Sequence, residues 1–180
     1  MSIRVLCLLS GGFEEIETVA PVDLLRRAGA QVVMASLSYD RLVTGRCHIT
    51  VQADTVLADV VEQPFDLLLI PGGPAVITLR EDGRAAQLAK SFVDAGQPVA
   101  AICAAPTILA DAGLLEGRRF TAHASVRDQL PGALASERVV EDGLIITSRG
   151  AGTAVEFGLA LVKRLFGATK AEEVAKAIMV

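Results

Sequence analysis

The stretch VAAICAAP, residues 99–106, decides the fold of this chain. It completes an apolar run over 98–102 that predicts a buried strand, and small residues then permit a tight turn into a helix over 104–112. Pro106 suits the first turn of that helix, where its missing N–H costs little. Cys103 falls at the junction of strand and helix, which is the position of the reactive side chain in a nucleophile elbow.

Apolar runs alternate with amphipathic stretches on both sides of this junction. The alternation predicts an α/β fold with right-handed crossovers and a mostly parallel sheet. A length of 180 residues favours one domain, residues 1–180. Predicted strands lie at 3–9, 31–36, 66–70 and 98–102, with turns or short strands over 37–51 and a hairpin over 138–148. Predicted helices lie at 14–28, 54–61, 83–95, 104–112, 154–166 and 171–179.

Composition and motifs exclude several classes of function. The formal net charge is −4 and no basic stripe occurs, so no nucleic acid partner is expected. Neither a long apolar run nor a basic amphipathic helix occurs, so no membrane contact is expected. Glycine-rich nucleotide motifs are missing, and Cys7, Cys47 and Cys103 are spaced too widely for a zinc pattern, so we expect no cofactor and no metal. Free cysteines indicate a reduced, cytoplasmic setting.

Three segments are expected to meet at the carboxyl edge of the sheet, where ligands of such folds bind. The first contains Cys103, whose thiol pKa the following helix N-terminus is expected to lower. A buried, inert cysteine is the alternative. The second contains Gly72 and Gly73, which let backbone N–H groups approach a ligand. The N–H groups of Gly73 and Ala104 can together form an oxyanion hole, although a plain turn explains the glycines equally well.

The third segment carries three acids at the start of the first predicted helix, residues 14–28. Glu15 directly precedes the apolar residues Ile16 and Val19, so we expect it to point inward. A carboxyl group forced near a thiolate would have a raised pKa and could donate a proton to it. The alternative is that all three acids only complement the helix dipole. His123 follows a short predicted strand and is a further candidate, although a lone histidine is more often structural.

At these residues the sequence resembles the ThiJ/PfpI superfamily and, within it, the DJ-one branch. The likeness rests on four ordered motifs at 14–29, 69–73, 100–106 and 142–150. It implies a flavodoxin-like three-layer sandwich that is shared with class I glutamine amidotransferases. It also implies roles for the candidate residues: Cys103 as the nucleophile, often oxidised to sulfinate, Glu15 as the protonated carboxyl beside its sulfur, Gly73 and Ala104 as backbone donors, and His123 as the neighbouring histidine of part of the branch.

The resemblance further implies a homodimer whose interface includes the helix over 14–28, with Ile16 and Val19 as contacts. Two departures stand out. The protease-like branch has a histidine immediately after its cysteine, whereas this chain has Ala104, so protease activity is not expected. Close relatives also carry a C-S-R segment whose arginine reaches the partner's site. Here residues 45–48 read GRCH, which leaves open whether Arg46, Cys47 or His48 contributes there.

The leading hypothesis is a cofactor-independent cysteine enzyme that acts on small reactive aldehydes, of the glyoxalase III or deglycase type, converting methylglyoxal to lactate. The alternative is a redox-sensing stress-response protein or chaperone whose cysteine is oxidised to sulfinic acid. A thiazole-phosphate enzyme, a peptidase and a structural dimer with an inert cysteine are weaker alternatives. The sequence does not identify the physiological substrate.

Overall fold

A seven-stranded sheet forms the centre of the structure, a computed structural model that describes residues 2–180. The strand order is β5-β2-β1-β6-β7-β9-β8, and every neighbouring pair is parallel except β8 and β9. A separate antiparallel hairpin is formed by β3 and β4. The strands are β1 (Arg4–Leu9), β2 (Gln31–Ser36), β3 (Leu42–Thr44), β4 (Thr50–Gln52), β5 (Thr55–Val56), β6 (Leu67–Ile70), β7 (Val99–Ile102), β8 (Val139–Asp142) and β9 (Ile145–Ser148).

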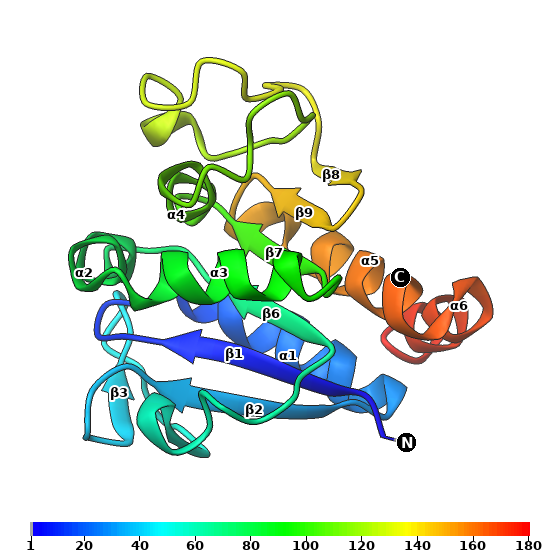
Figure 1. Ribbon diagram of the computed structural model, residues 1–180. Helices are drawn as coiled ribbons and strands as arrows, with labels where there is room; N and C mark the ends of the chain where they lie inside the picture. The colour runs from blue at the N-terminus through cyan, green and yellow to red at the C-terminus, as the bar shows by residue number, and fades with distance from the viewer. Residues whose placement is uncertain (1) are drawn as a thin grey trace.

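Helices cover both faces of the sheet and make a three-layer sandwich (Figure 1). One layer holds α2, α3 and α4, and the other holds α1, α5 and α6. The mostly parallel α/β sandwich predicted from the sequence is therefore confirmed. The helices are α1 (Glu15–Ala28), α2 (Ala75–Asp82), α3 (Arg84–Asp94), α4 (Pro106–Asp111), α5 (Ala154–Phe166) and α6 (Ala168–Ala177), with single turns of 3-10 helix at η1 (Leu57–Asp59), η2 (Ala124–Val126) and η3 (Ala151–Thr153).

The central strands are apolar throughout because both of their faces are covered. In β1, Leu6 and Leu8 pack into the layer with α3, whereas Val5 and Cys7 pack into the layer with α1. This alternation follows from the two-residue period of a strand. Burial raises the pKa of the Cys7 thiol to about 12, as expected for an unreactive core cysteine.

Two predictions of local structure are wrong, and one helix was not predicted. Residues 54–61 form β5 and η1 rather than a helix, and the short strand expected before His123 is irregular loop. Helix α2 was not predicted, because Val76, Ile77 and Thr78 are β-branched and lower the helix propensity of that stretch.

The carboxyl ends of β1, β6 and β7 lie side by side, since β6 pairs with both of the other strands. The loops that follow these strands contain Gly12, Gly73 and Cys103 and therefore meet at one edge. Across residues 2–180, no helix has the length and apolar character needed to cross a membrane.

Candidate active site

Cys103 lies on a tight turn at the carboxyl end of β7. Its φ of 68° is left-handed, a conformation that is uncommon outside glycine and strained for cysteine. The turn is held by two backbone hydrogen bonds: the Cys103 N–H donates to the Ser148 carbonyl at 2.9 Å, and the Cys103 carbonyl accepts from the His123 N–H at 2.8 Å. The half-buried side chain is thereby fixed toward a pocket of about 420 Å³. This is the strand-to-helix elbow that the sequence predicts.

The expected lowering of the Cys103 thiol pKa is not found. The helix after the elbow begins at Pro106, not at Ala104, and α4 has only six residues. Burial, followed by the negative charge of Glu17, raises the pKa of the Cys103 thiol to about 12. Only the nearby N–H groups of Gly73 and Ala104 act in the opposite direction. Protonation of Glu17 would remove the second of these two effects and so favour the thiolate.

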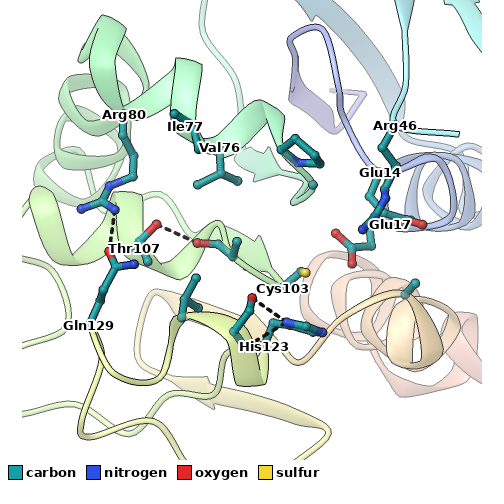
Figure 2. A pocket seen from close by; sticks show the side chains of 16 residues that line it. Glu14, Glu17, Arg46, Val76, Ile77, Arg80, Cys103, Thr107, His123 and Gln129 are labelled. Carbon is teal, nitrogen blue, oxygen red and sulfur yellow. Dashed lines mark hydrogen bonds between the residues drawn. The ribbon is translucent and has the colours of Figure 1, made fainter. Parts of the chain in front are cut away.

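Glu17, not Glu15, is the carboxyl group beside the sulfur. The Glu17 side chain hydrogen-bonds with Cys103, and Figure 2 shows the two facing each other. The backbone N–H groups of Gly72, at 3.0 Å, and Ala151 also donate to the Glu17 carboxylate. Burial raises the pKa of Glu17 to about 7, and the neighbouring charge of Glu14 adds to the effect.

Glu15 is buried, as expected, but its predicted place beside the sulfur is wrong. That prediction assumed that Ile16 and Val19 face the core. Their side chains are 55% and 49% exposed, so that side of α1 faces outward. The buried side of α1 instead carries Glu17, Pro21, Leu24 and Ala28. These positions follow the i, i+4, i+7 spacing of one helix face, and this spacing could have identified Glu17 from the sequence.

Glu15 holds a turn between β3 and β4 instead. Its Oε1 accepts hydrogen bonds from the backbone N–H groups of Cys47, at 2.7 Å, and Ile49, at 3.5 Å. Desolvation acts to raise the pKa of Glu15, but hydrogen bonds from its own N–H and from Cys47 and Ile49 outweigh it, so the pKa is lowered. Glu15 is thus a buried, ionised carboxylate without access to Cys103.

The predicted backbone N–H donors fall into two groups: two face the Cys103 sulfur, and one faces the Glu17 carboxylate. The N–H groups of Gly73 and Ala104 point at the Cys103 sulfur, where an oxyanion formed on an adjacent carbon would also lie. The Gly72 N–H points at Glu17 and is not a donor to the substrate side. Gly72 is nevertheless required, since a Cβ there would come within 2.5 Å of Glu17 Oε2 and 2.6 Å of Cys103 Cβ.

His123 lines the same pocket with an exposed side chain. Its Nδ1 accepts from the Ser125 N–H at 3.2 Å and lies 2.8 Å from the Ser125 hydroxyl. The accepting Nδ1 leaves Nε2 as the protonated nitrogen. Neither ring nitrogen hydrogen-bonds to Cys103 or Glu17, so the ring is not the base that ionises the thiol.

The far end of the pocket is closed by residues that the sequence did not suggest. Arg80 makes a two-pronged ion pair with Asp111, at 2.6 and 2.9 Å, and donates to the Gln129 side chain at 2.8 Å. Figure 2 shows Arg80 and Gln129 together, away from Cys103. Arg46 lines the pocket on the side of Glu14 and Glu17, whereas Cys47 is exposed and lies outside it. Residues 45–49 form a turn between β3 and β4 rather than a strand.

The fold and the site together define a class of α/β proteins in which a cysteine on a strained elbow meets a buried carboxyl group at the edge of a parallel sheet. Within residues 2–180, no group of three or more His, Cys, Asp or Glu side chains is arranged to hold a metal ion. The sequence profile of the DJ-1/PfpI family matches residues 3–164. This chain belongs to that family.

Individual relatives agree with this assignment. The chain is 39% identical to protein dj-1beta of Drosophila melanogaster over 184 residues, covering 100% of this chain and 98% of that protein. The crystal structure of Drosophila DJ-1beta matches with a TM-score of 0.96 at 38% identity, covering 100% of this chain and 99% of that one. An oxidised DJ-1 of Toxoplasma gondii matches at 0.93 and 33%, covering 99% and 98%. A Pyrococcus abyssi protein named as a deglycase is 35% identical over 166 residues, 91% of this chain and 99% of that protein.

Proposed function

We propose that the protein is a cofactor-independent cysteine enzyme that acts on small reactive aldehydes, of the glyoxalase III or deglycase type. The observation that carries the proposal is the contact between Cys103 and Glu17 at the pocket, with two backbone N–H groups aimed at the sulfur. A group whose pKa lies near neutrality is suited to both taking up and releasing a proton. The Pyrococcus relative named as a deglycase supports the same substrate class.

In the proposed reaction, Glu17 accepts the thiol proton and the Cys103 thiolate attacks the aldehyde carbon of methylglyoxal. The new C–S bond converts the carbonyl oxygen to an oxyanion, which the N–H groups of Gly73 and Ala104 stabilise and Glu17 then protonates. Glu17 next removes the proton from the carbon bound to sulfur and delivers it to the neighbouring carbonyl carbon, while the hydroxyl proton of the first carbon passes to the former carbonyl oxygen. The product is a thioester of lactate. Hydrolysis releases lactate and restores the thiol, so the net reaction adds one water and needs no external oxidant.

Lactate formation from methylglyoxal by the purified protein tests this function. We expect turnover by the wild type and none above background for Cys103→Ala. Cys47→Ala, which removes an exposed thiol outside the pocket, is the matched control and should retain turnover. Equal rates for the wild type and Cys103→Ala would rule the proposal out.

A redox-sensing role is the second candidate, and the oxidised state of the Toxoplasma relative favours it. Two equivalents of hydrogen peroxide would convert the Cys103 thiol to a sulfinate and leave two waters. A protonated Glu17 could hydrogen-bond to the resulting sulfinate. Mass spectrometry after mild peroxide should then show two added oxygens at Cys103 in the wild type and fewer in Glu17→Leu. Preferential oxidation of the exposed Cys47 would contradict this role.

We also propose that the protein acts as a homodimer in the cytoplasm. Ile16, Val19 and Ile49 are about half exposed on α1 and the adjacent turn, and together they offer an apolar face to a second copy. The three free cysteines fit a reducing compartment. Light scattering should give twice the mass of one chain, and Ile16→Lys should reduce it to that of a monomer. A monomeric wild type would refute the dimer without affecting the proposed chemistry.

A further inference from the structure

A second cavity of about 320 Å³ adjoins the Cys103 pocket and is lined by basic side chains. His123 and Ala151 line both cavities. Gly150 lies at their boundary, because a Cβ on this residue would be 3.8 Å from the Cys103 sulfur and 3.3 Å from the His123 ring carbon Cδ2. The second cavity is therefore within reach of a substrate that is attached to, or reacting with, Cys103.

The cavity has an excess of positive charge, because one of its two arginines has no carboxylate partner among the described residues. Arg138 pairs with Glu156 at 2.6 Å and donates to the Gly152 carbonyl at 2.9 Å. Arg149 donates only to the Ala135 carbonyl, at 3.2 Å, and has no carboxylate partner within residues 2–180. A guanidinium that is bound only by a carbonyl keeps its full positive charge and several unused N–H donors.

Other groups around the cavity favour the same kind of ligand. His123 presents Nε2–H, because its Nδ1 already accepts from Ser125. The acid closest to the boundary is Glu17, whose Oε1 would lie 3.6 Å from a Gly150 Cβ. In the proposed reaction Glu17 is protonated when the thiolate attacks, so it does not then repel an anion. Arginine and histidine N–H donors around a backbone loop suit the oxygens of a phosphate or carboxylate.

We propose that the cavity of Arg149, Arg138, His123 and the loop 150–153 is a subsite for the anionic end of the substrate, a phosphate or a carboxylate. Small aldehydes that carry such a group on the far side are then preferred over methylglyoxal, which has none. This inference deepens the proposed function and rests on it for the identity of Cys103 as the reacting group and for the protonated state of Glu17. It also gives Arg149, which lies in the 142–150 motif, and His123 a role in binding rather than in proton transfer.

The test compares anionic and neutral alkylating reagents of the same shape. Iodoacetate and iodoacetamide, and the one-carbon-longer 3-iodopropionate and 3-iodopropionamide, each form a C–S bond with Cys103 and release iodide. Peptide mapping by mass spectrometry separates Cys103 from the exposed Cys47. For the reagent long enough to reach the subsite, we expect the anionic-to-neutral rate ratio to fall about fivefold in Arg149→Gln, the upper end of the range for one solvent-exposed ion pair.

Two further variants and two competitors complete the experiment. Arg149→Lys keeps the charge and should restore most of the ratio, whereas Lys90→Gln removes an exposed charge on α3 and should leave it unchanged. Inorganic phosphate or acetate should lower the wild-type ratio toward that of Arg149→Gln, and the one effective at the lower concentration identifies the preferred anion. The same ratio in the wild type and Arg149→Gln for both reagent pairs would overturn the subsite. If the wild type forms no lactate but Arg149→Gln still lowers the alkylation-rate ratio, the proposed function is refuted and the subsite is not.

Discussion

Two glutamates of α1 lie only two residues apart, yet they belong to different parts of the molecule. Glu17 faces the elbow of Cys103, and Glu15 faces the turn between β3 and β4. Two residues correspond to about 200° of rotation around a helix, so neighbouring acids point to nearly opposite sides. The pKa of Glu17 is raised, and the pKa of Glu15 is lowered. Burial acts to raise both pKa values and prevails at Glu17, whereas at Glu15 the hydrogen bonds from its own N–H and from Cys47 and Ile49 outweigh it.

The largest expected effect is a difference in lactate formation between variants of the two glutamates. Glu17→Gln removes the group that exchanges protons with sulfur and substrate, so lactate formation should fall about a hundredfold or more, the range of general acid–base catalysis. Glu15→Gln keeps an acceptor for the turn and should lose far less. Steady-state kinetics of the two purified variants provides the comparison. A loss in Glu15→Gln as large as that in Glu17→Gln would show that the turn, and not only the elbow, belongs to the active site.

The second prediction uses the opposite pKa directions. The folded pKa of Glu17, about 7, lies above its ordinary value of 4.5, so its contribution to stability is complete below about pH 4.5 and is lost as the pH rises through 7. The folded pKa of Glu15 is lowered, so its contribution is present above the unfolded pKa and is lost as the pH falls through the folded one. The two carboxyls therefore give stability profiles of opposite slope.

Urea unfolding at a series of pH values measures these slopes. The free energy of unfolding of wild type minus that of Glu17→Gln should decrease by up to about 3 kcal/mol between pH 4.5 and 7.5. The difference between wild type and Glu15→Gln should change only below about pH 4.5, where it decreases on acidification. Parallel profiles for the two variants would mean that the glutamates share one environment.

The comparison also explains what the sequence could and could not predict. The elbow at Cys103 follows from a short apolar run and small residues, both of which are local features. The choice between Glu15 and Glu17 depends on which face of α1 is buried. Ile16 and Val19 misled that choice because apolar side chains can also face outward.

Long-range contacts account for the remaining differences. The irregular chain around His123 is held by distant residues: the Thr121 N–H donates to the Thr147 hydroxyl, and the Thr121 hydroxyl donates to the Leu134 carbonyl. The sequence around Thr121 does not indicate either of these hydrogen-bond acceptors. The same holds for Arg149, since the second cavity forms only when β9 is placed beside the loop of His123. Motifs located the Cys103 site, but its charges depend on tertiary structure.

Each glutamate is packed against its own glycine, which gives a third prediction of intermediate size. A Cβ at Gly72 would approach Glu17 Oε2 to 2.5 Å, and one at Gly45 would approach Glu15 Oε1 to 2.3 Å. Gly72→Ala and Gly45→Ala should each reduce the free energy of unfolding by about 1–3 kcal/mol, as overpacked substitutions do. Gly152→Ala, where a Cβ meets nothing within 4 Å, is the matched control. Chemical denaturation measures all three, and a loss in the control equal to the others would argue against a packing effect.

The smallest expected effect concerns backbone strain, which both regions contain. Cys103 and His48 have left-handed φ angles of 68° and 65°, in the elbow and in the Glu15 turn respectively. Glycine adopts this conformation without the steric cost of a Cβ. Cys103→Gly should therefore be about 1 kcal/mol more stable than Cys103→Ala, the reference that removes only the sulfur. His48→Gly should gain less, because histidine is enriched among the residues that tolerate this region. Thermal unfolding of the variants measures both differences, and a Cys103→Gly variant less stable than Cys103→Ala would show that the elbow stores no strain.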